Sequence, residues 1–119
     1  MAGYVDLFVL PVPKKMIPTY RRISSKMGRI MRGHGATEYR EFLGNDLHVK
    51  KMVSPLRMVK MKSGDVLVFA VVGFRSRSHR DQVNKRTMSD PRVKKMCEQP
   101  MFVDCKRMVY GGFSTIVKA

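Results

Sequence analysis

The sequence predicts an α+β fold of the ferredoxin-like type, in which elements follow the order βαββαβ and both helices cover one face of an antiparallel sheet. Three observations support this prediction. Residues 66–74 form an apolar segment that leaves no charge on either face of a strand. Residues 14–32 repeat apolar side chains with helical spacing. Turn-forming and capping residues divide the rest of the 119-residue chain into short segments, which suits a single domain, 1–119.

The first strand is expected at residues 4–10. Pro11 and Pro13 are expected to end it, because proline has no N–H to donate to a neighbouring strand. Asp6 interrupts an otherwise apolar pattern. A carboxylate at such a position is costly to bury unless it is paired or hydrogen-bonded.

The first helix is expected at residues 14–32. Pro18 falls in its first turn, where the missing N–H costs little. Apolar residues at spacings of four and three indicate one buried stripe, made of Met16, Tyr20, Ile23, Met27 and Ile30. The basic residues on the other side are typical of a solvated helix face and include Arg22, Lys26 and Arg29.

The second strand is expected at residues 36–43 and is more polar than the first. Residues 44–46, Gly-Asn-Asp, indicate a turn. Residues 47–55 are basic and irregular, which favours a loop, and residues 56–61 are interpreted as a short extended segment. This segment leads into the central strand at residues 66–74.

The second helix is expected to begin at Ser76 or Ser78, since serine is a preferred N-cap residue, and to run to about residue 88. A short helical turn at residues 91–96 then starts with proline at a favoured first position.

The last strand is expected at residues 107–117, after a loop that contains Pro100. Gly111 and Gly112 lie inside it and indicate either a bulge or a close backbone approach.

Two helices cover only one face of a four-stranded sheet, so the second apolar face of residues 66–74 requires another cover. Leaving it in water would forgo about 1.5–3 kcal/mol for each large apolar side chain. The whole stability of a domain is only about 5–15 kcal/mol. A second copy related by a two-fold axis is the simplest cover. We therefore expect a homodimer whose sheets pack face to face, a dimeric α+β barrel.

The charge of the chain is unusual, because 24 Lys and Arg oppose 9 Asp and Glu and leave a net charge of +15. Such a charge favours polyanions such as nucleic acid, anionic lipid or acidic proteins. The basic residues are spread along the sequence, however, and the chain has no Trp and 8% aromatic residues for stacking on bases. Dedicated nucleic-acid binding is therefore the less favoured interpretation, and a proteome that is basic throughout is the alternative explanation.

Two cysteines, Cys97 and Cys105, are too few for a disulfide framework and are expected to be free thiols. The longest apolar run stops at Arg75 and is far shorter than the ~20 residues that span a bilayer, so no membrane association is expected. The first residues lack the basic and apolar regions of a signal peptide, and we expect the protein in the cytoplasm.

Four motifs resemble those of the YbaA-like family of small bacterial proteins of unknown function. They are Tyr4-Val5-Asp6, Arg80-Asp81 with Asn84, Met88-Ser89-Asp90-Pro91-Arg92, and Lys106-Arg107-Met108-Val109-Tyr110-Gly111-Gly112-Phe113. The resemblance covers nearly the whole chain. It implies the dimeric α+β barrel fold and brings no established activity.

No phosphate-binding glycine loop, nucleophile elbow or zinc-protease motif is present in the sequence. The three histidines lie in separate elements without ligand spacing, so neither a metal nor another cofactor is expected. Five polar residues are expected near the sheet and are the candidate ligand-binding residues: Tyr4, Asp6, Arg40, Glu41 and Tyr110.

Dimeric ferredoxin-like barrels are similar to small cofactor-free monooxygenases, haem-degrading enzymes and stress-response proteins, which bind ligands between the sheet and its helices. By that analogy Asp6 is a proton acceptor, Arg40 an anion partner, and Tyr4 or Tyr110 a donor. The alternative is that a backbone amide, an arginine or the Tyr110 hydroxyl simply satisfies Asp6.

Three functions follow from these observations. The first is a homodimer that binds or turns over a small molecule in a pocket between sheet and helices. The second is a basic nucleic-acid-binding protein that acts through phosphate contacts. The third is a structural or stress-associated dimer without a ligand.

Overall fold

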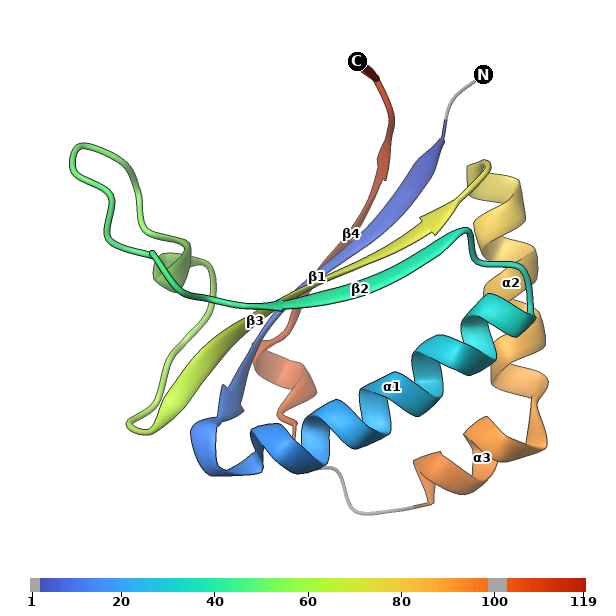
Figure 1. The fold of residues 1–119 in the computed structure, drawn as a ribbon, viewed down its shortest axis with the longest axis horizontal. Coiled ribbons are helices and arrows are strands. Elements are labelled where there is room, and N and C mark those ends of the chain that lie inside the picture. The colour runs from blue at the N-terminus through green and yellow to red at the C-terminus, as the bar shows by residue number, and fades with distance from the viewer. Residues whose placement is uncertain (1–2, 99–102) are drawn as a thin grey trace.

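A computed structural model of the chain describes residues 3–98 and 103–119. Within these residues one antiparallel sheet has the strand order β2-β3-β1-β4, and its α-helices lie on one side of it (Figure 1). The strands are β1 (Tyr4–Pro13), β2 (Glu38–Leu43), β3 (Asp65–Phe74) and β4 (Val109–Ser114). The helices are α1 (Ile17–Gly33), α2 (Arg77–Ser89) and α3 (Pro91–Cys97), with short 3₁₀ helices at Lys14–Met16, Pro55–Met58 and Cys105–Arg107. The predicted α+β class and βαββαβ order are confirmed.

The first strand is longer than the sequence predicts, because β1 continues through both prolines to Pro13. β4 pairs with β1 only as far as Val9, so the last residues of β1 have only β3 beside them in the described part of the sheet. Backbone N–H groups alternate along a strand, and the Lys14 N–H donates toward the β3 side, to the Gly64 carbonyl at 2.8 Å. The backbone nitrogens of Pro11 and Pro13 therefore face away from β3. On that side β4 no longer pairs with β1, so no N–H donor is needed there.

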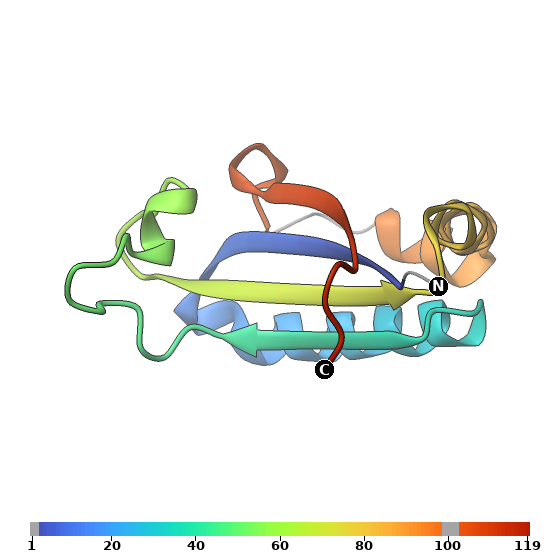
Figure 2. The same ribbon diagram turned by 90° about the horizontal axis from the view of Figure 1, so that it is seen from above.

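Figure 2 shows α1 running beneath β2 and β3, with α2 seen end-on beyond the end of β3. α1 follows a 3₁₀ turn and has Pro18 in its first turn, as predicted. Its buried residues face the sheet, and Ile30 is 2% exposed. Ile23 departs from the predicted stripe, since 39% of it is exposed.

Helices α2 and α3 are each capped at the N-terminus by a side-chain oxygen. Ser76 Oγ accepts a hydrogen bond of 3.0 Å from the His79 N–H and starts α2. The Asp90 carboxylate accepts one of 2.8 Å from the Arg92 N–H and starts α3. The predicted turn at residues 91–96 is thus a separate helix, and the predicted loop around Pro100 lies outside the described residues.

The last strand, Val109–Ser114, is shorter than the predicted range of 107–117. Its register against β1 is continuous, with Gly112 opposite Asp6, so the two glycines form no bulge. The Tyr4 phenol instead lies against Gly112, where a Cβ atom would collide with it. Of the two interpretations of Gly111 and Gly112, the close approach is the observed one.

The core between helices and sheet consists of two clusters. One contains Tyr4, Met31, Ala36, Val72, Phe74 and Val83. The other contains Leu10, Val12 and Val68, with Met16, Ile17 and Tyr20 packed against it. The two clusters agree with the alternation predicted for the central strand. Val68 and Val72 face the helices, whereas Leu67 faces the other side of the sheet.

The far face of the sheet is partly covered by the chain itself, whereas the sequence predicts only a second copy as its cover. Val59 from the segment 44–64 packs on Val9 and Leu67, and Leu47, Leu56 and Met61 of the same segment surround them. The predicted extended piece at residues 56–61 belongs to this cover, and its first part is the 3₁₀ helix Pro55–Met58. Three phenylalanines on this face remain partly exposed, Phe69 at 37%, Phe42 at 39% and Phe113 at 53%.

Candidate functional site

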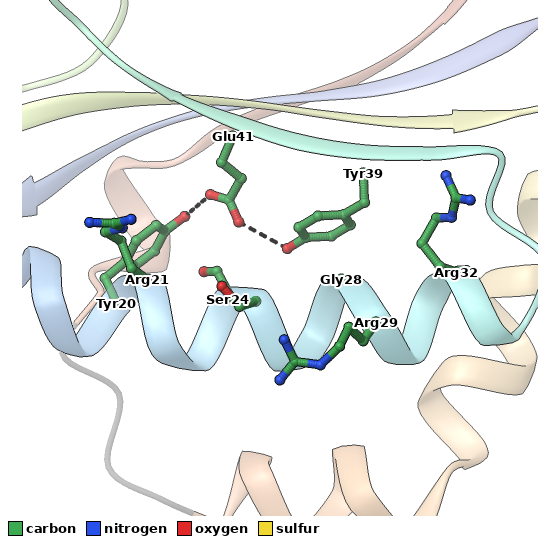
Figure 3. Close-up of a pocket in the computed structure, with 9 residues that line it drawn as sticks. Tyr20, Arg21, Ser24, Gly28, Arg29, Arg32, Tyr39 and Glu41 are labelled. Carbon is green, nitrogen blue, oxygen red and sulfur yellow. Dashed lines mark hydrogen bonds between the residues drawn. The ribbon is translucent and has the colours of Figure 1, made fainter.

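A cleft of about 540 Å³ lies between α1 and the edge strand β2 (Figure 3). A pocket of this volume is within the range of about 300–1,000 Å³ that small-molecule sites occupy. Its lining comes from two elements only and consists of Tyr20, Arg21, Ser24, Ser25, Gly28, Arg29, Arg32, Tyr39 and Glu41.

Local periodicity explains how these side chains meet. Alternate residues of a strand share a face, so Tyr39 and Glu41 of β2 both point toward α1. Residues four apart share a face of a helix, so Tyr20, Ser24 and Gly28 line up beneath them. A Cβ atom on Gly28 would lie 2.6 Å from the Tyr39 ring, and glycine there allows the ring to rest on the helix.

The Glu41 carboxylate is held at both oxygens. The Tyr20 hydroxyl donates to Oε1 and the Tyr39 hydroxyl donates to Oε2, the latter at 2.9 Å (Figure 3). Burial raises the pKa of Tyr20, and its hydrogen bond to Glu41 raises that pKa further. Burial and the Glu41 charge likewise raise the pKa of Tyr39. Both phenols therefore keep their protons at neutral pH, and the base of the cleft presents four oxygens, two from the Glu41 carboxylate and one from each phenol.

Three arginines of α1 supply positive charge at the rim of the same cleft. Arg32 donates from Nη1 to the Thr37 carbonyl at 2.8 Å. Arg21 and Arg29 are exposed, and neither forms an ion pair within the described residues. The cleft thus offers hydrogen-bond donors with positive charge at its rim and acceptors with negative charge at its base.

Three of the five predicted site residues, Tyr4, Asp6 and Tyr110, lie together in the structure, but outside the cleft between α1 and β2. Asp6 is 2% exposed, and its Oδ1 accepts a bond of 2.7 Å from Arg80 Nη1. The same Nη1 donates to the Tyr110 hydroxyl at 2.6 Å, and the guanidinium lies 5.1 Å from the centre of the Tyr4 ring. Burial raises the pKa of Tyr110, and the Asp6 charge adds to this rise. Arg80 is the partner of Asp6 that the sequence left unidentified.

The other two predicted residues are neighbours in sequence and lie on opposite faces of β2. Glu41 is in the cleft described above. Arg40 is on the far face, where it forms a 3.5 Å ion pair with Glu38 and stacks 4.7 Å from the Phe42 ring centre. The Asp6 and Glu41 clusters are also apart, since β3 lies between β1 and β2 and separates those strands by about 9.6 Å.

Of the residues that line the cleft, only Glu41 is among the candidate ligand-binding residues predicted from the sequence. Tyr20 carried the only available signal, because a residue with a polar tip interrupts the apolar stripe of α1. Of the three cleft arginines, only Arg29 belongs to the predicted solvated face, and nothing local in the sequence relates any of them to β2.

Among the described residues, no group of three or more His, Cys, Asp or Glu side chains is placed to hold a metal ion. In the same part of the chain, no helix has the length and apolar character that crossing a membrane requires.

Comparisons with known proteins agree with this architecture. The structure of Rv0793 from Mycobacterium tuberculosis has a similar fold, with a TM-score of 0.56 and 13% identity, and the match covers 100% of this chain and 99% of that one. A NipSnap family protein with unknown function from Agrobacterium tumefaciens is also similar, with a TM-score of 0.54 and 14% identity, and the match covers 95% of this chain and 86% of that one. At these identities the likeness concerns the fold alone.

The sequence comparisons are closer. The uncharacterized protein YbaA of Escherichia coli K12 is 35% identical over 114 residues, which cover 96% of this chain and 97% of that protein. A YbaA protein of Shigella flexneri matches to the same extent. The family described as Protein of unknown function (DUF1428) matches residues 3–105. The resemblance predicted from the four motifs is therefore confirmed, and the chain belongs to the DUF1428 family.

Proposed function

We propose that this protein is a homodimer that binds a small molecule in the cleft between α1 and β2. One observation carries the proposal: a single carboxylate, Glu41, is held by two phenols at the base of a 540 Å³ cleft with arginines at its rim. Three titratable groups gathered in a concave site, two of them with raised pKa values, are typical of binding and active sites.

The distribution of donors and acceptors indicates the ligand class. Arg21 and Arg29 favour an acidic group, because a guanidinium donates two parallel bonds to a carboxylate or phosphate. Both phenols donate their hydrogen bonds to Glu41, so the oxygens at the base of the cleft accept hydrogen bonds from a ligand. A small molecule with an acidic group at one end and an amino or hydroxyl group at the other fits this arrangement.

The test is a thermal-shift screen of small amino and hydroxy acids and phosphate monoesters, followed by calorimetry of each compound that raises the melting temperature. Glu41→Gln and Arg29→Gln are each expected to weaken binding about tenfold or more, since each removes a charge-assisted bond of about 1.5–3 kcal/mol. Arg29 is exposed, so its replacement tests the cleft without disturbing the fold.

The matched control is Arg40→Gln, which changes the neighbouring residue on the opposite face of β2. It is expected to bind the ligand as the unmodified chain does. Equal affinity of the Arg29→Gln variant and the unmodified chain would contradict the proposal, as would a screen in which no compound of this class raises the melting temperature.

The homodimer is supported by the far face of the sheet. Phe42, Phe69 and Phe113 are partly exposed there, and an apolar groove of about 230 Å³ lies between the sheet and the segment 44–64. Contiguous exposed apolar surface of this kind marks interaction sites. A second copy presents the same surface, and a two-fold axis would place the two apolar surfaces against each other.

A further inference from the structure

We propose that the outer side of the helix layer binds the phosphate backbone of double-stranded nucleic acid, through basic residues of which Arg22 and Lys26 lie outside the cleft. α1 and α3 together contain eight Lys and Arg residues and no Asp or Glu. These two helices therefore hold eight of the 24 basic residues of the chain, and of the eight only Arg92 forms an ion pair within the described residues, with Asp90.

All five basic residues of α1 lie on its solvent side. The buried positions of α1 are Gly28, Ile30 and Met31, whereas all five basic residues are exposed: Arg21, Arg22, Lys26, Arg29 and Arg32. Within the described residues, neither Arg22 nor Lys26 forms an ion pair. Their charges are available to a partner.

α3 extends the same surface. Its buried residue is Val93, and Lys94 and Lys95 are exposed. The two helices belong to one layer, since His34 after α1 contacts the carboxylate of Asp90 before α3 at 2.7 Å. Figure 1 shows both on the same side of the sheet.

The geometry suits phosphates. Residues 21 to 32 span about 16 Å at a rise of 1.5 Å per residue. Duplex DNA carries one phosphate charge per about 1.7 Å of axis, so several phosphates lie within reach of this helix. Four of the five basic residues of α1 are arginines, whose planar donors match phosphate oxygens in pairs.

The side chains around these charges favour a duplex over single strands or a membrane. Proteins that bind single strands stack bases on aromatic residues, but the one aromatic residue of α1, Tyr20, is bonded to Glu41, and α3 has none. Helices that lie in a membrane surface insert their apolar face, and the apolar face of α1 packs on the sheet.

The test is fluorescence anisotropy of a labelled mixed-sequence 30-base-pair duplex with the full chain at 50–300 mM salt. If the five basic residues of α1 each neutralise one phosphate, log affinity falls against log salt with a slope of about −4.5. The double variant Arg22→Gln/Lys26→Gln is expected to bind about tenfold or more weakly at 100 mM salt, with a slope shallower by about two. Neither residue lines the cleft, so the small-molecule screen above is expected to give the same result with this variant.

The matched control is Lys50→Gln/Arg57→Gln, which removes the same charge from exposed positions of the segment 44–64. It is expected to retain the affinity of the unmodified chain. Equal weakening by both double variants would show that only the net charge matters and would overturn the proposal. Absence of duplex binding at 50 mM salt would also overturn it, as would binding to phosphatidylserine vesicles in preference to the duplex.

Discussion

Gly28 is the point where the Tyr39 ring rests on α1. Replacing it by alanine would place a Cβ atom 2.6 Å from that ring. Overpacking of this kind costs about 1–3 kcal/mol, whereas alanine in place of glycine favours a helix by about 1 kcal/mol. Gly28→Ala is therefore expected to lower the free energy of unfolding by about 1 kcal/mol in urea denaturation.

The matched control is Gly33→Ala in the same helix, where no atom lies within 4 Å of the added Cβ. It is expected to leave the free energy of unfolding unchanged or to raise it by up to about 1 kcal/mol. If both variants were equally stable, the contact between Tyr39 and Gly28 would not constrain the cleft.

His79 is buried and neutral. Its Nδ1 accepts a 3.0 Å hydrogen bond from the Arg75 N–H and so carries no proton. Burial lowers the pKa of His79, and the charges of Arg75 and Arg86 lower it further. In the unfolded chain histidine titrates near pH 6.5. As pH falls below about 6.5 the unfolded chain binds a proton that folded His79 does not, so the stability falls with pH there.

The expected contribution of His79 is a loss of up to about 1.4 kcal/mol of unfolding free energy per pH unit below pH 6.5. His79→Asn keeps an acceptor for the Arg75 N–H and removes the titration, so its stability is expected to vary less between pH 7 and 5. The exposed His48 provides the control, and His48→Asn is expected to follow the unmodified chain. Identical pH curves for the two variants would contradict this role of His79. The measurement is urea denaturation at several pH values.

Arg80 ties helix α2 to strands β1 and β4. Its guanidinium bonds Asp6 and the Tyr110 hydroxyl, and its side chain is 12% exposed. Removing one partner of a buried ion pair costs about 3–5 kcal/mol, because the other charge stays buried. Arg80→Met is therefore expected to lower the unfolding free energy by this amount in urea.

The double variant Asp6→Leu/Arg80→Met removes both charges and is expected to be more stable than Arg80→Met alone. Arg77→Met, at an exposed position of the same helix, is expected to change the stability little. A double variant less stable than Arg80→Met would show that the pairing is not what makes the single replacement costly.

Among the elements, the unexpected length of β1 and the unexpected cover of the far face share one cause. Pro11 and Pro13 would end the strand only if neighbouring strands needed backbone N–H donors on both of its sides. Which strands lie beside β1 at these positions depends on the whole sheet. The segment 44–64 has no strong period of its own, and its cover of the far face arises from contacts of Val59 with β1 and β3. Both outcomes depend on residues far away in sequence.

The assembled molecule leads to a prediction of its oligomeric state. Light scattering is expected to give twice the 13.7 kDa mass of one chain at micromolar concentration. Phe42→Lys/Phe113→Lys places charges on the far face and is expected to give monomers, since burying an unpaired charge is costly. Both residues are at least 39% exposed in a single chain, so the monomer is expected to stay folded.

The control for that experiment is Met88→Lys, which changes an exposed apolar residue on the helix side, 60% exposed. It is expected to leave the dimer intact. A monomeric mass for the unmodified chain would rule out the homodimer, and a mixed result in which Met88→Lys dissociates it would place the interface on the helices.

The periods of 2 and 3.6 residues, together with prolines, glycines and serine caps, were sufficient to predict the class of the fold and the order of its elements. These signals act through local backbone geometry, which is determined by residues close together in the sequence. The partners of Asp6 and Glu41 followed only from the folded chain, as did the separation of Arg40 from Glu41. Those contacts join elements through strand order, register and helix placement, and no local pattern encodes which arginine or tyrosine will lie opposite a given carboxylate.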